Sequence, residues 1–133
     1  MQIIPQPARQ VLLHAEDISA IAQARDIIDN HLNQHFTIRE LSKKVCLNEF
    51  KLKYGFRFKY GTGLHKYLRI QRFEKAKELL FKGKQVEEIA ELVGYKSVSS
   101  FCQSFKKEVG IPPLQWISRE AGKVLSEATG KVV

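Results

Sequence analysis

The sequence predicts an all-α protein of about seven helices, arranged as two helix-turn-helix lobes joined by a long bridging helix. Three observations favour this class. Apolar residues recur at helical spacing in successive segments, no alternating run predicts a strand, and one helical pattern occurs twice. At 133 residues and 44% hydrophobic composition, the chain suits one domain, or two small lobes, with a real core.

The chain is expected to begin with a leader or linker over residues 1–16, which hold two prolines and no clear period. The first lobe then spans residues 17–63. It opens with a helix that Asp17 can cap and that runs to about Gln34, because apolar residues recur along this stretch at three- and four-residue intervals.

A pair of short helices follows within the first lobe. Thr37 and Glu40 form a capping box that predicts the start of the first short helix. A turn at Cys46 and Leu47 ends it, and small residues are usual at the Cys46 position, so packing is the expected role of its side chain. Asn48 is a good N-cap for the second short helix.

The second short helix, in the stretch Asn48–Gly61, has two different faces. Leu52 and Phe56 share an apolar back. The front carries aromatic and basic side chains, namely Phe50, Lys53, Tyr54 and Arg57. Gly55, which costs about 1 kcal/mol in a helix relative to alanine, is expected to permit close packing against the bridging helix. Such a helix is either a solvated surface helix or one that presents its front to DNA.

The bridging helix is predicted over residues 64–82, since Gly83 ends a long apolar pattern there. The second lobe, residues 83–127, is expected to hold a short helix, a turn at Gly94, a further helix to about Val109 and a last helix. Residues 128–133 are expected to form a flexible tail.

The two short-helix pairs repeat each other. Four apolar positions of the first pair recur 48 residues later, and four further positions recur 49 residues later. The first set is Ile38, Leu41, Val45 and Leu47, matched by Val86, Ile89, Val93 and Tyr95; the second is Leu52, Phe56, Gly61 and Tyr67, matched by Phe101, Phe105, Gly110 and Trp116. The shift predicts a one-residue insertion after the second turn and a duplicated helix-turn-helix.

Charge and composition narrow the class of partner. The net charge is +8, and residues 41–133 hold 19 basic and nine acidic residues. This excess indicates a polyanionic partner, and nucleic acid fits better than a membrane because the charge does not follow one amphipathic helix. Two cysteines without a CxxC motif, and no signal peptide, favour a cytoplasmic location. His31 and His35 have no third ligand nearby at zinc spacing, so no metal site and no cofactor are predicted.

Three stretches together resemble the DNA-binding domain of the AraC/XylS family of bacterial transcription regulators. They are TIRELSKKVCLNEFKLKYGFRFKYG, YLRIQRFEKAKELL and VEEIAELVGYKSVSSFCQSFKKEVGIPPLQW, and the resemblance covers about residues 18–117. The last stretch is the most specific of the three. The N-terminal part of the chain looks most like a subgroup that includes siderophore-linked regulators. Many members of the family carry a separate N-terminal effector or dimerisation domain, so residues 1–16 look like a linker from such a domain, absent here. The alternative is a stand-alone activator with two motifs, which the family also contains.

The resemblance implies two sets of DNA contacts. The base-reading set is Phe50, Lys53 and Tyr54 in the first lobe, with Val98, Ser99, Cys102 and Gln103 in the second. The phosphate set is Thr37, Lys51, Arg57, Lys59, Arg72, Lys106 and Lys107, with a structural salt bridge as the alternative for Arg72. Lys53 suits guanine and Gln103 suits adenine, whereas Phe50 suits a thymine methyl group. A redox role for Cys102 is the alternative to a plain helix residue.

The partners implied are double-stranded DNA and RNA polymerase, with no membrane, and an effector ligand would bind a domain that this chain lacks. The sequence therefore favours a sequence-specific regulator of transcription, and we expect it to be an activator. The alternatives are a helical protein-interaction module and a non-specific nucleic-acid binder. No phosphate-binding loop and no nucleophile–base pair is apparent in the sequence, so an enzyme is not expected.

Overall fold

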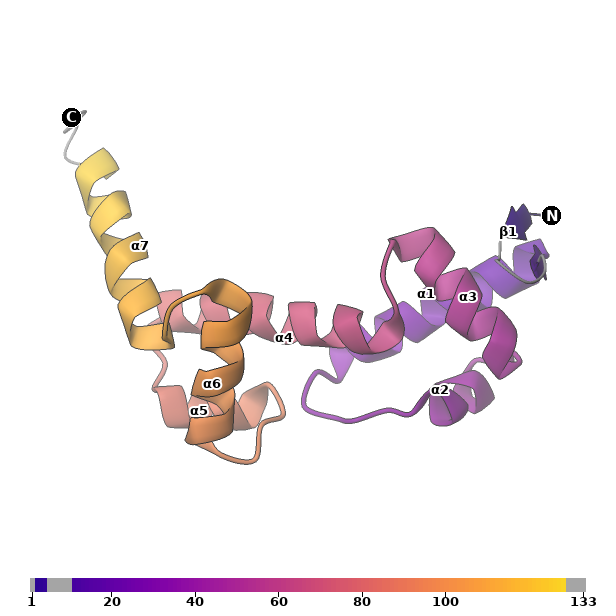
Figure 1. Cartoon of the computed structure of the whole chain (residues 1–133), viewed down its shortest axis with the longest axis horizontal. Helices are drawn as coiled ribbons and strands as arrows, with labels where there is room; N and C mark the ends of the chain where they lie inside the picture. The colour runs from indigo at the N-terminus through magenta and orange to yellow at the C-terminus, as the bar shows by residue number, and fades with distance from the viewer. Residues whose placement is uncertain (1, 5–10, 129–133) are drawn as a thin grey trace. The chain divides into compact units, whose positions relative to one another are not determined.

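The computed structural model describes residues 2–4 and 11–128; residues 1, 5–10 and 129–133 lie outside the described part (Figure 1). The described elements are β1 (Gln2–Ile4), β2 (Val11–Leu13), α1 (Ala15–Asn30), α2 (Ile38–Lys44), α3 (Glu49–Tyr60), α4 (Leu64–Phe81), α5 (Val86–Leu92), α6 (Val98–Val109) and α7 (Pro113–Ala128). Seven helices confirm the all-α class. Of the tail predicted over residues 128–133, only Ala128 is described, and it belongs to α7.

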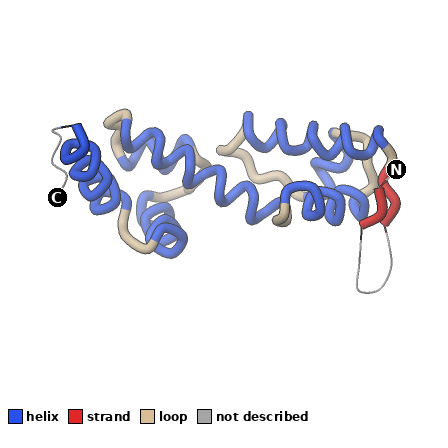
Figure 2. The backbone as a smooth tube through the Cα atoms, turned by 90° about the horizontal axis from the view of Figure 1, so that it is seen from above, coloured by secondary structure: helices blue, strands red, loops and turns tan. Residues whose placement is uncertain are grey.

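A short β-hairpin occupies part of the predicted leader, close to the N-terminus (Figure 2). β1 and β2 pair antiparallel, with Ile3 opposite Leu12. The expectation of no strand was wrong here, because three residues are too few to show an alternating pattern in the sequence. Leu13 is only 1% exposed and joins the first core, whereas Leu12 is 48% exposed.

Helix α1 begins earlier and ends earlier than predicted. It starts at Ala15, so Asp17 lies inside the first turn rather than at the cap. There its Oδ2 accepts a hydrogen bond of 2.9 Å from the backbone N–H of His14. At the other end, the Asn30 side-chain amide donates to the backbone carbonyl of Asp26 at 2.9 Å, and the helix ends at Asn30 instead of Gln34.

The chain forms two compact units, Met1–Gln71 and Arg72–Val133, and their boundary falls inside the continuous helix α4. The first core is built from β2, α1, α2, α3 and the first half of α4. Its most enclosed side chains are Leu13, Ile21, Ile28, Leu41, Leu52 and Phe56. The second core is built from the second half of α4 with α5, α6 and α7. Its most enclosed large side chains are Ile89, Val93, Phe101 and Phe105.

The predicted duplication is present in the structure. Helices α2 and α5 have seven residues each and start 48 residues apart, while α3 and α6 have twelve each and start 49 apart. The shift falls between Tyr95 and the N-cap Ser97, so Lys96 is the added residue. Both longer helices end at a left-handed glycine, Gly61 with φ 78° and Gly110 with φ 100°.

The duplication extends into the helices that follow. α7 begins 49 residues after α4. In the first unit Phe56 meets Tyr67 edge to face, with 5.3 Å between ring centroids. Its counterpart Phe105 meets Trp116 in the same way at 6.1 Å. Each repeat is therefore a three-helix element with an equivalent aromatic contact between its second and third helices.

The two turns have different residues at their left-handed position. Each turn needs a left-handed residue, which is Cys46 with φ 55° in the first motif and Gly94 with φ 89° in the second. Left-handed backbone is strained for a residue with a Cβ atom. Cys46 is exposed, so the predicted packing role of its side chain was wrong. The position matters for the backbone, not for the core.

Candidate nucleic-acid interface

The first candidate surface is the front of α3. Asn48 caps the helix, since its Oδ1 accepts a hydrogen bond of 2.7 Å from the backbone N–H of Lys51. Leu52 and Phe56 are fully buried on the back. Their burial fixes the rotation of the helix and turns the opposite side outward. That outward side carries the predicted front residues, Phe50, Lys53, Tyr54 and Arg57.

Three of these front residues form one cluster. The rings of Phe50 and Tyr54 lie 4.5 Å apart, and both are half-buried against the first core. The Lys53 ammonium lies 5.3 Å from the centre of the Tyr54 ring, within range of a cation–π contact. The cluster thus presents one exposed cation on an aromatic base that is packed in place.

The predicted phosphate residues of the first lobe differ in their surroundings. Arg57 and Lys59 are exposed. The Lys51 ammonium instead forms an ion pair of 2.9 Å with Asp17, and both side chains are largely covered. Thr37 caps α2, where its hydroxyl accepts from the Glu40 backbone N–H at 3.1 Å. The geometry counts against Lys51 as a phosphate contact, because its charge is already neutralised inside the protein.

The second candidate surface is the front of α6. Ser97 caps this helix, and its hydroxyl accepts from the backbone N–H of Ser100 at 3.1 Å. The predicted base-reading residues Val98, Ser99 and Gln103 are exposed, as are the predicted phosphate residues Lys106 and Lys107. The Gln103 amide lies 3.5 Å from the Ser99 hydroxyl, at the limit of a hydrogen bond.

The fourth predicted base-reading residue, Cys102, is half-buried against the second core. Burial, followed by the negative charge of Glu87, raises the pKa of its thiol. A raised pKa keeps the thiol protonated and unreactive at neutral pH, which favours the plain helix residue over a redox sensor. Cys102 stands at the position that Lys53 holds in α3.

Arg72 is buried, with 7% of its surface exposed. Its guanidinium lies 5.8 Å from the centre of the Tyr95 ring, and burial lowers its pKa. A phosphate cannot reach a side chain in this position without a rearrangement of the second core. The structure therefore favours the structural alternative that the sequence left open for this residue.

The two motifs also differ in charge. Residues 37–61 hold seven basic and two acidic side chains, whereas residues 85–110 hold three basic and four acidic ones. The acidic residues of the second motif gather on α5, where Glu87, Glu88 and Glu91 are all exposed. A phosphate backbone is attracted to the first surface more strongly than to the second.

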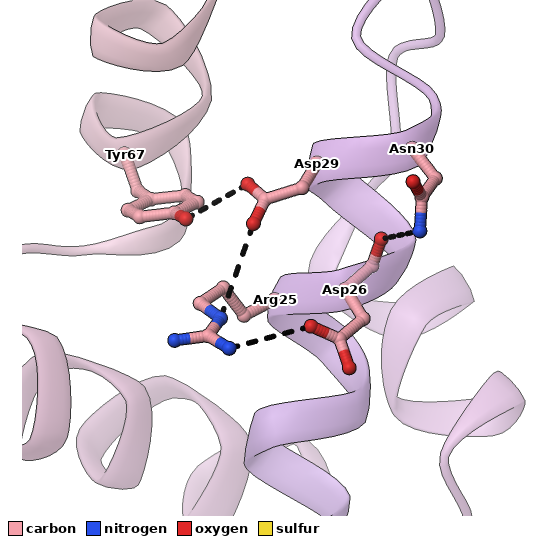
Figure 3. Close-up of polar contacts among 5 residues, drawn as sticks. All are labelled: Arg25, Asp26, Asp29, Asn30 and Tyr67. Atoms are coloured by element: carbon pink, nitrogen blue, oxygen red, sulfur yellow. Dashed lines mark hydrogen bonds and ion pairs between the residues drawn. The ribbon is translucent and has the colours of Figure 1, made fainter.

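A polar network that the sequence did not predict joins α1 to α4 in the first unit. The Tyr67 hydroxyl donates to Asp29 at 2.8 Å, and Arg25 lies between Asp26 and Asp29 at 3.4 and 3.9 Å (Figure 3). The same guanidinium lies 5.2 Å from the ring of Tyr60, the last residue of α3. Burial is the first cause that raises the pKa of Tyr67. The network supports the C-terminal end of α3, and no sequence motif marks it.

The described part of the chain shows neither a metal site nor a membrane span. No group of three or more His, Cys, Asp or Glu side chains there could hold a metal ion. Among the helices of the described residues, none combines the length and the apolar character that a membrane span requires.

A family model described as a helix-turn-helix domain matches residues 41–119. Two curated relatives are a probable transcriptional regulator, LumQ, of Photobacterium leiognathi, 30% identical over 95 residues, and an uncharacterised HTH-type transcriptional regulator of Staphylococcus aureus, 31% identical over 97 residues. The matches cover 68% and 72% of this chain but only 38% and 13% of those proteins. The chain therefore spans well under half the length of either relative.

Solved structures show the same fold. The C-terminal domain of AraT, a response regulator from Geobacillus stearothermophilus, superposes with a TM-score of 0.70 at 29% identity, over 75% of this chain and 84% of that one. The DNA-binding domain of AdpA, solved in complex with a target DNA, has a TM-score of 0.70 at 21% identity, over 78% and 95%. An AraC-type protein from Chromobacterium violaceum has a TM-score of 0.70 at 19% identity, over 81% and 97%.

Proposed function

Because this chain belongs to the AraC-type helix-turn-helix family of DNA-binding transcription regulators, we propose how it divides the reading of DNA between its two motifs. Sequence-specific binding of double-stranded DNA in transcription regulation is the function of the domain, which is not an enzyme. In our proposal α3 reads bases, and α6 mainly positions the domain on the duplex.

The observation that carries this division is the contrast between Lys53 and Cys102, which occupy equivalent positions. Lys53 is exposed and can donate to guanine O6 and N7 in the major groove. Cys102 is half-buried and neutral. Phe50 and Tyr54 add apolar edges that suit a thymine methyl group. The front of α3 therefore offers more base-specific chemistry than that of α6.

In α6, Gln103 supplies one adenine-reading amide, and Val98 and Ser99 supply small neighbouring contacts. The phosphate set that we propose consists of Thr37, Arg57, Lys59, Lys106 and Lys107. Lys51 and Arg72 are left out because the first is paired with Asp17 and the second is buried.

Selection of random duplexes against the domain tests the proposal. The expected product is two short motifs about one helical turn apart, roughly 34 Å, of which the one read by α3 is the stronger, if the two recognition helices enter successive major grooves. A protein-interaction module or a non-specific binder would enrich no motif over scrambled DNA, and that result would reject sequence-specific reading.

Two variants then assign the roles. Lys53→Ala should lose roughly 1–3 kcal/mol at one position of one half-site. Arg57→Ala should weaken all sequences alike and lower the salt slope of log K by about one. Lys123→Ala is the matched control, since it removes one charge from an exposed site on α7. A uniform loss in both test variants would refute the base-reading role of Lys53.

The acidic face of α5 supports a protein partner. Glu87, Glu88 and Glu91 repel phosphate but suit a basic protein surface, and the neighbouring Leu92 is 48% exposed. We infer RNA polymerase as this partner and activation as the outcome. In transcription assays on a promoter with the selected site, Glu87→Gln/Glu91→Gln should reduce activation although DNA binding is equal or tighter, because the variant removes two negative charges. Unaltered activation would exclude this surface.

The cellular setting belongs to the same proposal. We infer a cytoplasmic bacterial regulator, in which an effector ligand binds a part of the protein outside this chain. Membership of the siderophore-linked subgroup stays a prediction. Sequencing the full reading frame and testing candidate ligands against the intact protein would decide both points.

A further inference from the structure

One side of α3 is held by the segment that precedes and begins α1. Two residues of this segment touch α3 one turn apart, Leu13 at Gly55 and Asp17 at Lys51. We call Leu13 and Asp17 the brace. Both contacts lie on a side of the helix that is neither the buried back nor the exposed front.

The first brace contact is apolar and tight. A Cβ atom at Gly55 would overlap Ile21 Cδ1 and lie 3.3 Å from Leu13 Cδ1. Leu13 and Ile21 are 1% and 0% exposed, so neither has room to withdraw. The glycine thus brings α3 close to β2 and α1. The expected close packing against the bridging helix was wrong, because the atoms that meet Gly55 belong to these other elements.

The second brace contact is an ion pair across 34 positions of sequence. The Lys51 ammonium lies 2.9 Å from Asp17 Oδ2, with side-chain exposures of 28% and 14%. The same carboxylate oxygen accepts the His14 backbone N–H at 2.9 Å, which fixes the carboxylate at the start of α1. Charge-assisted bonds in a partly covered site are stronger and more directional than exposed ones. Together these bonds fix the first turn of α3 to the first turn of α1.

The second motif has no such contact among its described residues. The counterparts of Lys51 and Gly55 are Ser100 and Ser104, 49 residues later. The Ser100 backbone N–H donates to the Ser97 hydroxyl, and the Ser100 hydroxyl donates to the Ser97 carbonyl. These bonds remain within the first turn of α6.

We propose that the brace sets the position of α3 for base reading and that Asp17 is a positioning residue for the first half-site. The inference rests on the proposed function, since it takes α3 as the base reader. A helix displaced by about 1 Å misaligns a bidentate contact with a base edge, so the loss of the brace should appear as lost affinity at this half-site.

Asp17→Asn gives a sharp test, because electrostatics alone predicts the opposite result. The change removes a negative charge, which by itself tightens DNA binding. The brace predicts binding weakened about 5- to 10-fold on duplexes that keep only the first half-site. Binding should be unchanged on duplexes that keep only the second, and the salt slope should be unchanged. Glu16→Gln is the matched control, since it removes the same charge from an exposed side chain in the same first turn of α1.

Two further variants complete the test. Asp17→Glu should recover part of the affinity. Lys51→Met should reproduce Asp17→Asn with an unchanged salt slope, whereas a direct phosphate contact by Lys51 would lower that slope by about one and refute the brace. All variants are measured at temperatures where thermal unfolding shows each one folded.

Two results would overturn the inference. One is equal or tighter binding of Asp17→Asn to the first half-site. The other is an equal loss at both half-sites, which would assign Asp17 to general stability. Arg57→Ala separates these failures from failure of the proposed interface. If Arg57→Ala also binds normally, α3 is not the DNA-facing helix; if it weakens binding while Asp17→Asn does not, only the brace is wrong.

Discussion

Position for position, α3 and α6 bury large apolar side chains at equivalent positions and differ in the residues that they expose. Leu52 and Phe56 match Phe101 and Phe105, and all four are fully buried. On the outside, Lys53 matches Cys102 and Tyr54 matches Gln103. The two core positions stay large and apolar because dense packing excludes polar or small side chains there, whereas the exposed positions are free to diverge. Equal folds within one chain therefore do not imply equal roles.

The largest expected effect tests whether the two cores are equivalent. Phe56→Ala and Phe105→Ala should each lower the free energy of unfolding by about 3–5 kcal/mol, since both rings are fully buried. Denaturant unfolding followed by circular dichroism measures the loss. Trp116 is the single tryptophan and lies in the second unit, so its fluorescence reports that unit.

If the units unfold separately, Phe105→Ala should move the Trp116 transition much more than Phe56→Ala does. Equal shifts would show that the two cores unfold as one cooperative unit, and the comparison between them would then hold for the surfaces only.

An intermediate effect tests the tight side of α3. Gly55→Ala should cost about 1–2 kcal/mol net, because the overlap with Ile21 outweighs the gain in helix propensity. Gly122→Ala in α7 is the matched control, since no atom lies within 4 Å of the added Cβ. The control should gain about 0.5–1 kcal/mol. Thermal unfolding measures both, and a stabilised Gly55→Ala would mean that the side of α3 is loose.

The smallest effect compares the two turns. Cys46→Gly should stabilise the first motif by about 0.5–1 kcal/mol, because glycine adopts the left-handed backbone without strain. Gly94→Ala should destabilise the second by about 1 kcal/mol for the same reason. Chemical denaturation of the two variants measures the sign of each change in the free energy of unfolding. A change of the same sign in both variants would show that the two turns do not impose the same backbone conformation.

The duplication was predictable because its evidence is local. Helix lengths and glycine stops follow from apolar spacing and caps within each copy, and the one-residue shift appears when the two copies are compared at separations of 48 and 49 residues. The front of α3 was predictable for the same reason, since two buried residues define the opposite face. The hairpin was missed because three-residue strands carry no readable period.

The brace and the buried Arg72 were not predictable, because each depends on contacts between distant parts of the chain. Nothing near Lys51 in the sequence indicates that its ammonium group forms an ion pair with Asp17, 34 residues earlier. Arg72 looks like its exposed basic neighbours on α4 until the second core places Tyr95 beside it. A pattern assigns a side chain to a face but does not say what covers that face.

Helix α4 has a consequence for local opening of the protein. Its first half is buried in one core and its second half in the other, with the boundary at Gln71 and Arg72. A backbone amide exchanges with deuterium when its own hydrogen bond opens, and in a helix such opening is easiest at the ends. Each core holds one end of α4, so the middle of α4 should be the slowest-exchanging stretch of this helix. The backbone amides at the centre of α4 would then be strongly protected from hydrogen exchange.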